Sequence, residues 1–70
     1  MPSPVESKHF LLSYIGANDG VTYHQLNDFV SEKKLWFGPR EDLISFLSDQ
    51  KAGGRLEYIE ENETFLLIRP

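Results

Sequence analysis

The spacing of apolar residues changes once along this 70-residue chain, at Gly53-Gly54, and that change restricts the folds open to it. Before the two glycines, apolar residues recur every three or four positions, the period of helices that bury one face. After them, residues 55–59 alternate and residues 64–68 are β-branched and apolar, which predicts a β-hairpin with a polar tip. We therefore expect an α+β fold in a single domain over residues 1–70.

Two helix starts have the spacing of a capping box, in which a hydroxyl and a side chain three residues later bond the free backbone amides. These are Ser3-Pro4-Val5-Glu6 and Thr22-Tyr23-His24-Gln25. The first helix is expected to end at Gly16, which is followed by a turn at residues 18–20, and the second to end near Lys34. A short extended segment at Val21 is expected between them.

Gly38-Pro39 is expected to open a third helix over residues 39–51, with Glu41 and Asp42 in its first turn. Gly53-Gly54 then ends it. The buried stripe of this helix is expected to consist of four apolar residues at helical spacing: Leu43, Ile44, Phe46 and Leu47.

The order of helix, extended segment, helix, helix and hairpin resembles the winged-helix superfamily, with residues 43–47 and Gly54-Arg55-Leu56 carrying the likeness. This resemblance implies a three-helix bundle with a C-terminal β-hairpin. Gly20 with residues 42–47 and 65–68 is similar to a LOTUS (OST-HTH) domain, a protein- and RNA-binding variant whose second and third helices have a longer connection. Residues 54–58 with 65–70 are similar to the first winged helix of an ESCRT-II subunit.

Composition narrows the function classes. The chain has no cysteine, which excludes disulfides and thiolate metal sites. The N-terminal residues lack the basic and apolar regions of a signal peptide, and the apolar run at residues 65–68 is far too short to span a bilayer. We therefore expect an intracellular protein, cytoplasmic or nuclear.

Residues that could support catalysis are few. His9 and His24 fall on different expected helices, and no glycine-rich phosphate loop is present. His24 and Asp28 are four residues apart and could face one metal ion, but two ligands do not make a site. The sequence predicts a non-enzymatic protein without a cofactor or a metal.

Charge disfavours binding to duplex DNA, because the net charge is −4 and the hairpin carries Glu57, Glu60, Glu61 and Glu63. The third helix is also neutral to acidic, since it carries Arg40 and Lys51 against Glu41, Asp42 and Asp49. One segment remains a candidate for RNA or single strands, since basic and aromatic residues alternate there. It contains Lys33, Lys34, Trp36, Phe37 and Arg40, although Leu35 and one of the two aromatic residues are expected to fill the core.

The last strand supports protein binding instead. Phe65, Leu66, Leu67 and Ile68 do not alternate with polar residues, as a strand with one buried face should. Either Phe65 and Leu67 or Leu66 and Ile68 face outward, unless Val5 or the first helix covers them. An exposed edge of this strand could also accept another strand, including that of a second copy. We expect mainly protein–protein interaction within a larger assembly, with nucleic-acid binding as the alternative.

Overall fold

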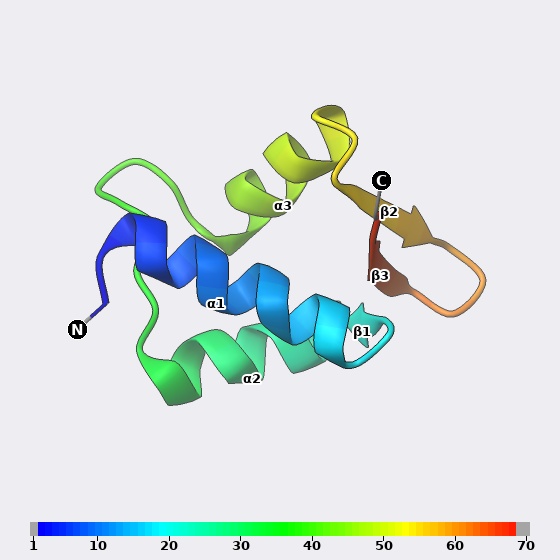
Figure 1. The fold of residues 1–70 in the computed structure, drawn as a ribbon, viewed down its shortest axis with the longest axis horizontal. Coiled ribbons are helices and arrows are strands. Elements are labelled where there is room, and N and C mark those ends of the chain that lie inside the picture. Colours follow the sequence, from blue (N-terminus) through cyan, green and yellow to red (C-terminus); the bar gives the residue numbers. More distant parts are fainter. Residues whose placement is uncertain (1, 69–70) are drawn as a thin grey trace.

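The computed structural model describes residues 2–68 and contains three helices and a three-stranded antiparallel sheet (Figure 1). The helices are α1 (Pro4–Ala17), α2 (Tyr23–Lys33) and α3 (Leu43–Ala52), and the strands are β1 (Val21–Thr22), β2 (Leu56–Ile59) and β3 (Thr64–Leu67). The prediction of an α+β fold is confirmed. Met1, Arg69 and Pro70 lie outside the described residues, and so does the end of the likeness drawn over residues 65–70.

Both predicted capping boxes are present. The Ser3 hydroxyl accepts a hydrogen bond from the Glu6 amide at 3.2 Å, and the Glu6 carboxylate accepts one from the Ser3 amide at 3.3 Å. Thr22 and Gln25 form the same pair at 3.2 and 2.9 Å. Because these bonds satisfy backbone donors that a helix start leaves free, α1 and α2 begin where the sequence predicts.

The end of α1 differs from the prediction. Gly16 is helical, and the helix continues to Ala17 because Asn18 satisfies the Tyr14 carbonyl with its side-chain amide, at 2.7 Å, and with its backbone amide. The left-handed conformation expected at Gly16 is adopted two residues beyond the helix, by Asp19 at φ 55°. The expected turn at residues 18–20 is present.

The third helix starts later than predicted. Asp42 is its N-cap, since the carboxylate accepts from the Ser45 amide at 2.9 Å, and Pro39 lies in the preceding turn. Gly53 ends the helix as expected. The expected burial of Ile44 is wrong, because successive residues turn by about 100° around a helix and Leu43, Phe46 and Leu47 already occupy the core-facing side.

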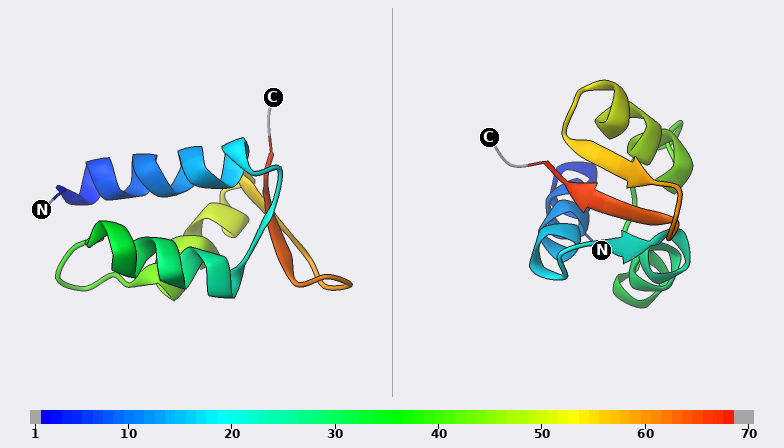
Figure 2. Two further views of the ribbon diagram at one scale, coloured as in Figure 1. Left: turned by 90° about the horizontal axis from the view of Figure 1, so that it is seen from below. Right: turned by 90° about the vertical axis from the view of Figure 1, so that its right-hand side faces the viewer.

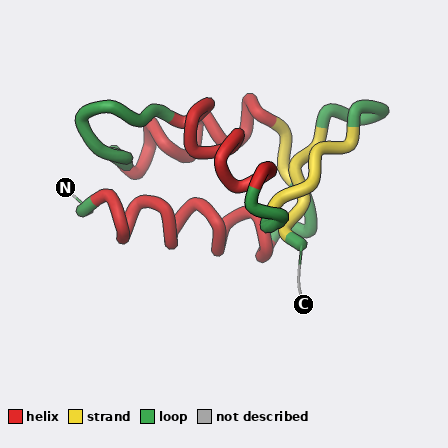
Figure 3. The backbone as a smooth tube through the Cα atoms, turned by 90° about the horizontal axis from the view of Figure 1, so that it is seen from above, coloured by secondary structure: helices red, strands yellow, loops and turns green. Residues whose placement is uncertain are grey.

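The three strands are ordered β1-β3-β2, so β3 lies in the middle of the sheet. Val21 pairs with Phe65 on one side, and Tyr58 pairs with Phe65 on the other. The expectation that the last strand offers an edge to another strand is therefore wrong, because the short extended segment at Val21 pairs with it. Figures 2 and 3 show the helices on one side of this sheet, with the tip of the hairpin projecting away from them.

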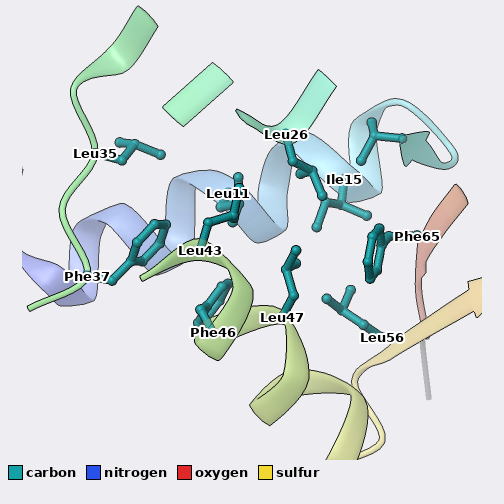
Figure 4. Packing of buried hydrophobic residues seen from close by; sticks show 11 residues of the cluster. Leu11, Ile15, Leu26, Leu35, Phe37, Leu43, Phe46, Leu47, Leu56 and Phe65 are labelled. Atoms are coloured by element: carbon teal, nitrogen blue, oxygen red, sulfur yellow. The ribbon is translucent and has the colours of Figure 1, made fainter. Parts of the chain in front are cut away.

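The core lies between the helices and the inner face of the sheet (Figure 4). Its centre is formed by Leu11 and Ile15 of α1, Leu26 of α2 and Phe46 of α3, all almost fully buried. Around them lie seven further buried residues: Val21, Leu35, Phe37, Leu43, Leu47, Leu56 and Phe65. Within residues 2–68, no helix has the length and apolar character that crossing a membrane requires.

Ser7 is the polar exception within this core. Its side chain is fully buried, and its hydroxyl accepts a hydrogen bond from the Trp36 backbone amide at 2.9 Å. The bond joins the first turn of α1 to the connection between α2 and α3, 29 residues away in sequence. It satisfies a donor that is partly buried by the packing of Leu35 and Phe37 on either side.

We predict that Ser7→Ala destabilises the protein by about 1–3 kcal/mol, because the Trp36 amide loses its partner in a place that water reaches poorly. Urea unfolding followed by circular dichroism measures the change. Ser31→Ala, on the exposed side of α2, is the matched control and should alter stability by less than about 0.5 kcal/mol. Equal effects of the two substitutions would contradict the structural role of Ser7.

Candidate functional site

Trp36 is held in a fixed position while its side chain stays accessible. Side chains from Leu35 to Phe37 point alternately into the core and out of it, so that Leu35 and Phe37 are buried and Trp36 is 45% exposed. Phe37 stacks on Phe46 with ring centroids 5.2 Å apart, and Ser7 holds the amide between the two buried residues. Because the backbone is held on both sides of Trp36, the indole ring points outward from a loop whose position is set by these contacts.

Tyr23 and Ile44 are two further large apolar residues that helix caps place at the surface. Tyr23 is the first residue of α2, directly after the Thr22 cap, and is 41% exposed. Ile44 is the second residue of α3, directly after the Asp42 cap and Leu43, and is 60% exposed. We call Tyr23, Trp36 and Ile44 together the α2–α3 face.

Two hollows join these three side chains into one surface. The first has a volume of about 360 Å³ and is lined by Tyr23, Trp36 and Ile44 together with Asn27 and Val30 of α2. The second, of about 350 Å³, extends from Tyr23 and Ile44 along α3 to the hairpin. Its further lining residues are Leu47, Ser48, Lys51, Tyr58 and Phe65. Since both hollows share Tyr23 and Ile44, the α2–α3 face is continuous.

Charges around the first hollow are acidic. Glu41 and Asp42 both line it, and Glu41 forms an ion pair with Lys8 of α1 at 2.9 Å. The hydrogen bond from the Ser45 backbone amide lowers the pKa of Asp42 below its ordinary value of 3.8, so this carboxylate is ionised at neutral pH. At the far end of the second hollow, the Lys51 ammonium lies over the Tyr58 ring, 5.5 Å from its centroid.

The structure separates the residues of the predicted basic-aromatic segment. Phe37 lies in the core and is therefore absent from the exposed site that the sequence predicted, whereas Leu35 is buried as expected. Lys33 lines a different hollow, between Phe10 and Phe29, and Trp36 faces the acidic one. Lys34 caps α2 in the left-handed conformation, and Arg40 is exposed in the following turn.

The residues of the last strand divide between two faces of the sheet. Phe65 is buried in the core and Leu67 packs against it. Leu66 and Ile68 alternate with them on the outer face, where Ile68 is 46% exposed. Of the two pairs left open by the sequence, the structure selects Leu66 and Ile68 as the outward pair. Val5 does not cover them, since it is 77% exposed on α1.

Sequence reasoning missed two residues of the α2–α3 face. Ile44 falls among apolar residues at helical spacing, which predicts its burial, and Tyr23 lies within the capping box that predicts the start of the second helix. The signal for Ile44 was the spacing of Asp42 and Ser45, which fits a simple N-cap and places Ile44 beside the stripe of Leu43 and Phe46.

The two residues considered for metal binding form an exposed pair. His24 Nε2 lies 3.4 Å from an Asp28 carboxylate oxygen on the surface of α2. Within residues 2–68, no group of three or more histidine, cysteine, aspartate or glutamate side chains is placed to hold a metal ion. His9 lies on α1, next to the Phe10 ring and on a different helix from His24.

The protein has the architecture of a small α+β domain in which three helices pack on one face of a three-stranded antiparallel sheet. No family model matches the chain, and neither a curated protein nor a solved structure matches it. The function of this protein is therefore inferred from the geometry of the site.

We predict that Asp42 contributes stability that depends on pH. Because its folded pKa is lowered, this contribution is fully present above the ordinary pKa of 3.8 and is lost as the pH falls through the lower, folded value. Asp42→Asn keeps a capping oxygen but cannot titrate. Urea midpoints measured from about pH 5 down to about pH 2 should fall more steeply for the native chain than for the variant. Parallel profiles would contradict this assignment.

Proposed function

We propose that this chain is a non-catalytic winged-helix module that binds another protein through its α2–α3 face. The winged-helix assignment is supported by the order of elements, in which a short strand precedes α2 and a hairpin follows α3, and by the sheet order β1-β3-β2. The non-catalytic assignment is supported by the lack of cysteine and by the placement of His9 and His24 on separate helices.

The observation that carries the proposal is the exposure of three large apolar residues around two adjoining hollows. Tyr23, Trp36 and Ile44 are each between 41% and 60% exposed, and burying a large apolar side chain stabilises a complex by up to about 1.5–3 kcal/mol. Tyrosine and tryptophan are also enriched among the residues that dominate protein–protein affinity. The rigid backbone at Trp36 lowers the entropy that binding would cost.

The electrostatics of this face favour a protein over a nucleic acid. A base stacked on Trp36 would bring its phosphates towards Glu41 and Asp42, which line the same hollow. No lysine or arginine lines the hollow beside Trp36, where single-strand binding would need one, and Lys33 lines a separate hollow. The partner is thus expected to offer apolar side chains to the α2–α3 face.

We predict that Ile44→Glu leaves the domain folded and weakens partner binding by at least about tenfold, because a carboxylate replaces a side chain buried in the complex. A photo-crosslinking residue at position 44 should identify the partner, and the affinity is then measured with both purified proteins. Val5→Glu, at an apolar residue of α1 that is also exposed, is the matched control and should bind normally. Equal weakening by both variants, or no adduct specific to position 44, would contradict the proposal.

Nucleic-acid binding is the second candidate, and it is supported by the half-exposed Trp36 in the same connection as Lys34 and Arg40, which form no ion pair within residues 2–68. If protein binding is the function, fluorescence anisotropy with random RNA and DNA oligomers should detect no binding at about 50 mM salt. Binding that is lost on Lys33→Glu with Lys34→Glu would instead establish the second candidate.

A further inference from the structure

The outer face of the sheet carries an apolar stripe that no part of residues 2–68 packs against as a layer. The pairing places Glu57 opposite Leu66 and Ile59 opposite Thr64, so these four side chains share the face turned away from the core. The strand pairing continues to Ile68, whose amide donates to the Arg55 carbonyl at 2.9 Å. Figure 2 shows this side of the sheet facing away from all three helices.

The turn before β1 approaches the stripe at one flank. Gly20 adopts φ 116°, and a Cβ atom there would lie 2.8 Å from the Leu66 side chain and 2.8 Å from that of Thr64. The glycine backbone therefore covers one flank of Leu66, which is partly buried as a result. Ile59 is also only partly buried, and Ile68 remains 46% exposed.

The border of this stripe is strongly acidic. Glu57 lies on the face itself, and three more glutamates, Glu60, Glu61 and Glu63, lie at the tip of the hairpin directly beyond it. None of the four carboxylates forms an ion pair within residues 2–68. Arg55 is the only basic residue between positions 55 and 68. Carboxylates left unpaired around an apolar stripe are the complement of a basic, amphipathic surface.

We propose that the outer face of the sheet binds an amphipathic helix of a partner protein that carries lysine or arginine beside its apolar residues. The apolar side of that helix packs on Ile59, Leu66 and Ile68, and its basic residues pair with the carboxylates of the hairpin. A helix fits this surface better than an added strand, because a sheet face is buried by a layer laid across it, whereas an added strand would pair with the edge of β1 or β2 and leave the face open. The same carboxylates repel nucleic acid and anionic lipid.

This face is distinct from the α2–α3 face. Tyr58 and Phe65, which line the second hollow, lie on the inner side of the same two strands. The hairpin therefore separates the two surfaces, and a partner can occupy either one alone. The two proposals can fail independently, since Ile44→Glu is expected to leave binding at the outer face unchanged.

A fluorescent amphipathic peptide of leucine and lysine tests the proposal on the intact chain. We expect it to bind, and a matched peptide with glutamate in place of lysine to bind at least about tenfold more weakly. Chemical-shift changes should map to Ile59, Leu66 and Ile68. If the acidic peptide binds as well, or if the shifts map to other residues, the proposal is wrong.

Two variants separate the apolar and the charged contributions. Ile68→Lys should weaken peptide binding by about tenfold, because it removes apolar area and adds repulsion, and Glu57→Lys by about fivefold. Val5→Lys, at an apolar residue that is also exposed but lies on α1, is the control and should bind as the native chain does. Urea unfolding confirms that each variant is folded.

Two results would show that a basic amphipathic helix is not the partner of this face. Unchanged affinity in Glu57→Lys would show that charge does not select the partner. A dimer in sedimentation that is abolished by Ile68→Lys would show that a second copy of this chain, and not a basic helix, covers the stripe. A monomer that binds the basic peptide, with both substitutions weakening it, supports the proposal.

Discussion

The hydrogen bond between the Ser7 hydroxyl and the Trp36 amide is the contact on which the arrangement of the other parts depends. It fastens the connection between α2 and α3 to the first turn of α1, and Leu35 and Phe37 enter the core on either side of it. The connection is nine residues without helix or strand, from Lys34 to Asp42, and ordering them costs conformational entropy that contacts with the rest of the protein must offset. Lys8 adds a second tie from α1 through its ion pair with Glu41.

The same anchor explains why an aromatic residue stands at the surface of so small a domain. A chain of this size buries a limited share of its surface. Each large apolar side chain that stays outside the core therefore does not contribute to the free energy of folding. Trp36 is outward because its two neighbours are buried and its backbone amide is bonded to Ser7. Ile44 is outward because the Asp42 cap sets the start of α3. The α2–α3 face is thus a consequence of how the core packs and where the helix caps lie.

Charge divides the molecular surface into regions suited to different partners. The first hollow of the α2–α3 face has Glu41 and Asp42 at its border, and the hairpin carries four glutamates around the outer stripe. Both apolar surfaces are therefore bordered by carboxylates, whereas Lys33 lies apart beside Phe10 and Phe29. Steering by these carboxylates would raise the rate at which basic partners associate and suppress association with polyanions.

The sequence by itself determined the local features of this protein. Capping side chains, the change of period at Gly53-Gly54 and the polar hairpin tip act between residues that are near in sequence, so α1, α2 and the hairpin could be predicted from them. The start of α3 could not, because Pro39 and Asp42 offer competing helix starts and the burial of Leu43 and Phe46 decided between them.

Only the tertiary structure decided which apolar residues remain at the surface. Trp36 and Phe37 are adjacent large aromatic residues, so the sequence does not show which of them is buried. In the structure Phe37 fills the core beside Phe46 and Trp36 stays at the surface. Leu66 and Leu67 are likewise interchangeable in a strand until the pairing of β3 between β1 and β2 assigns a face to each. Burial depends on contacts between distant segments, and a single sequence records those contacts only indirectly.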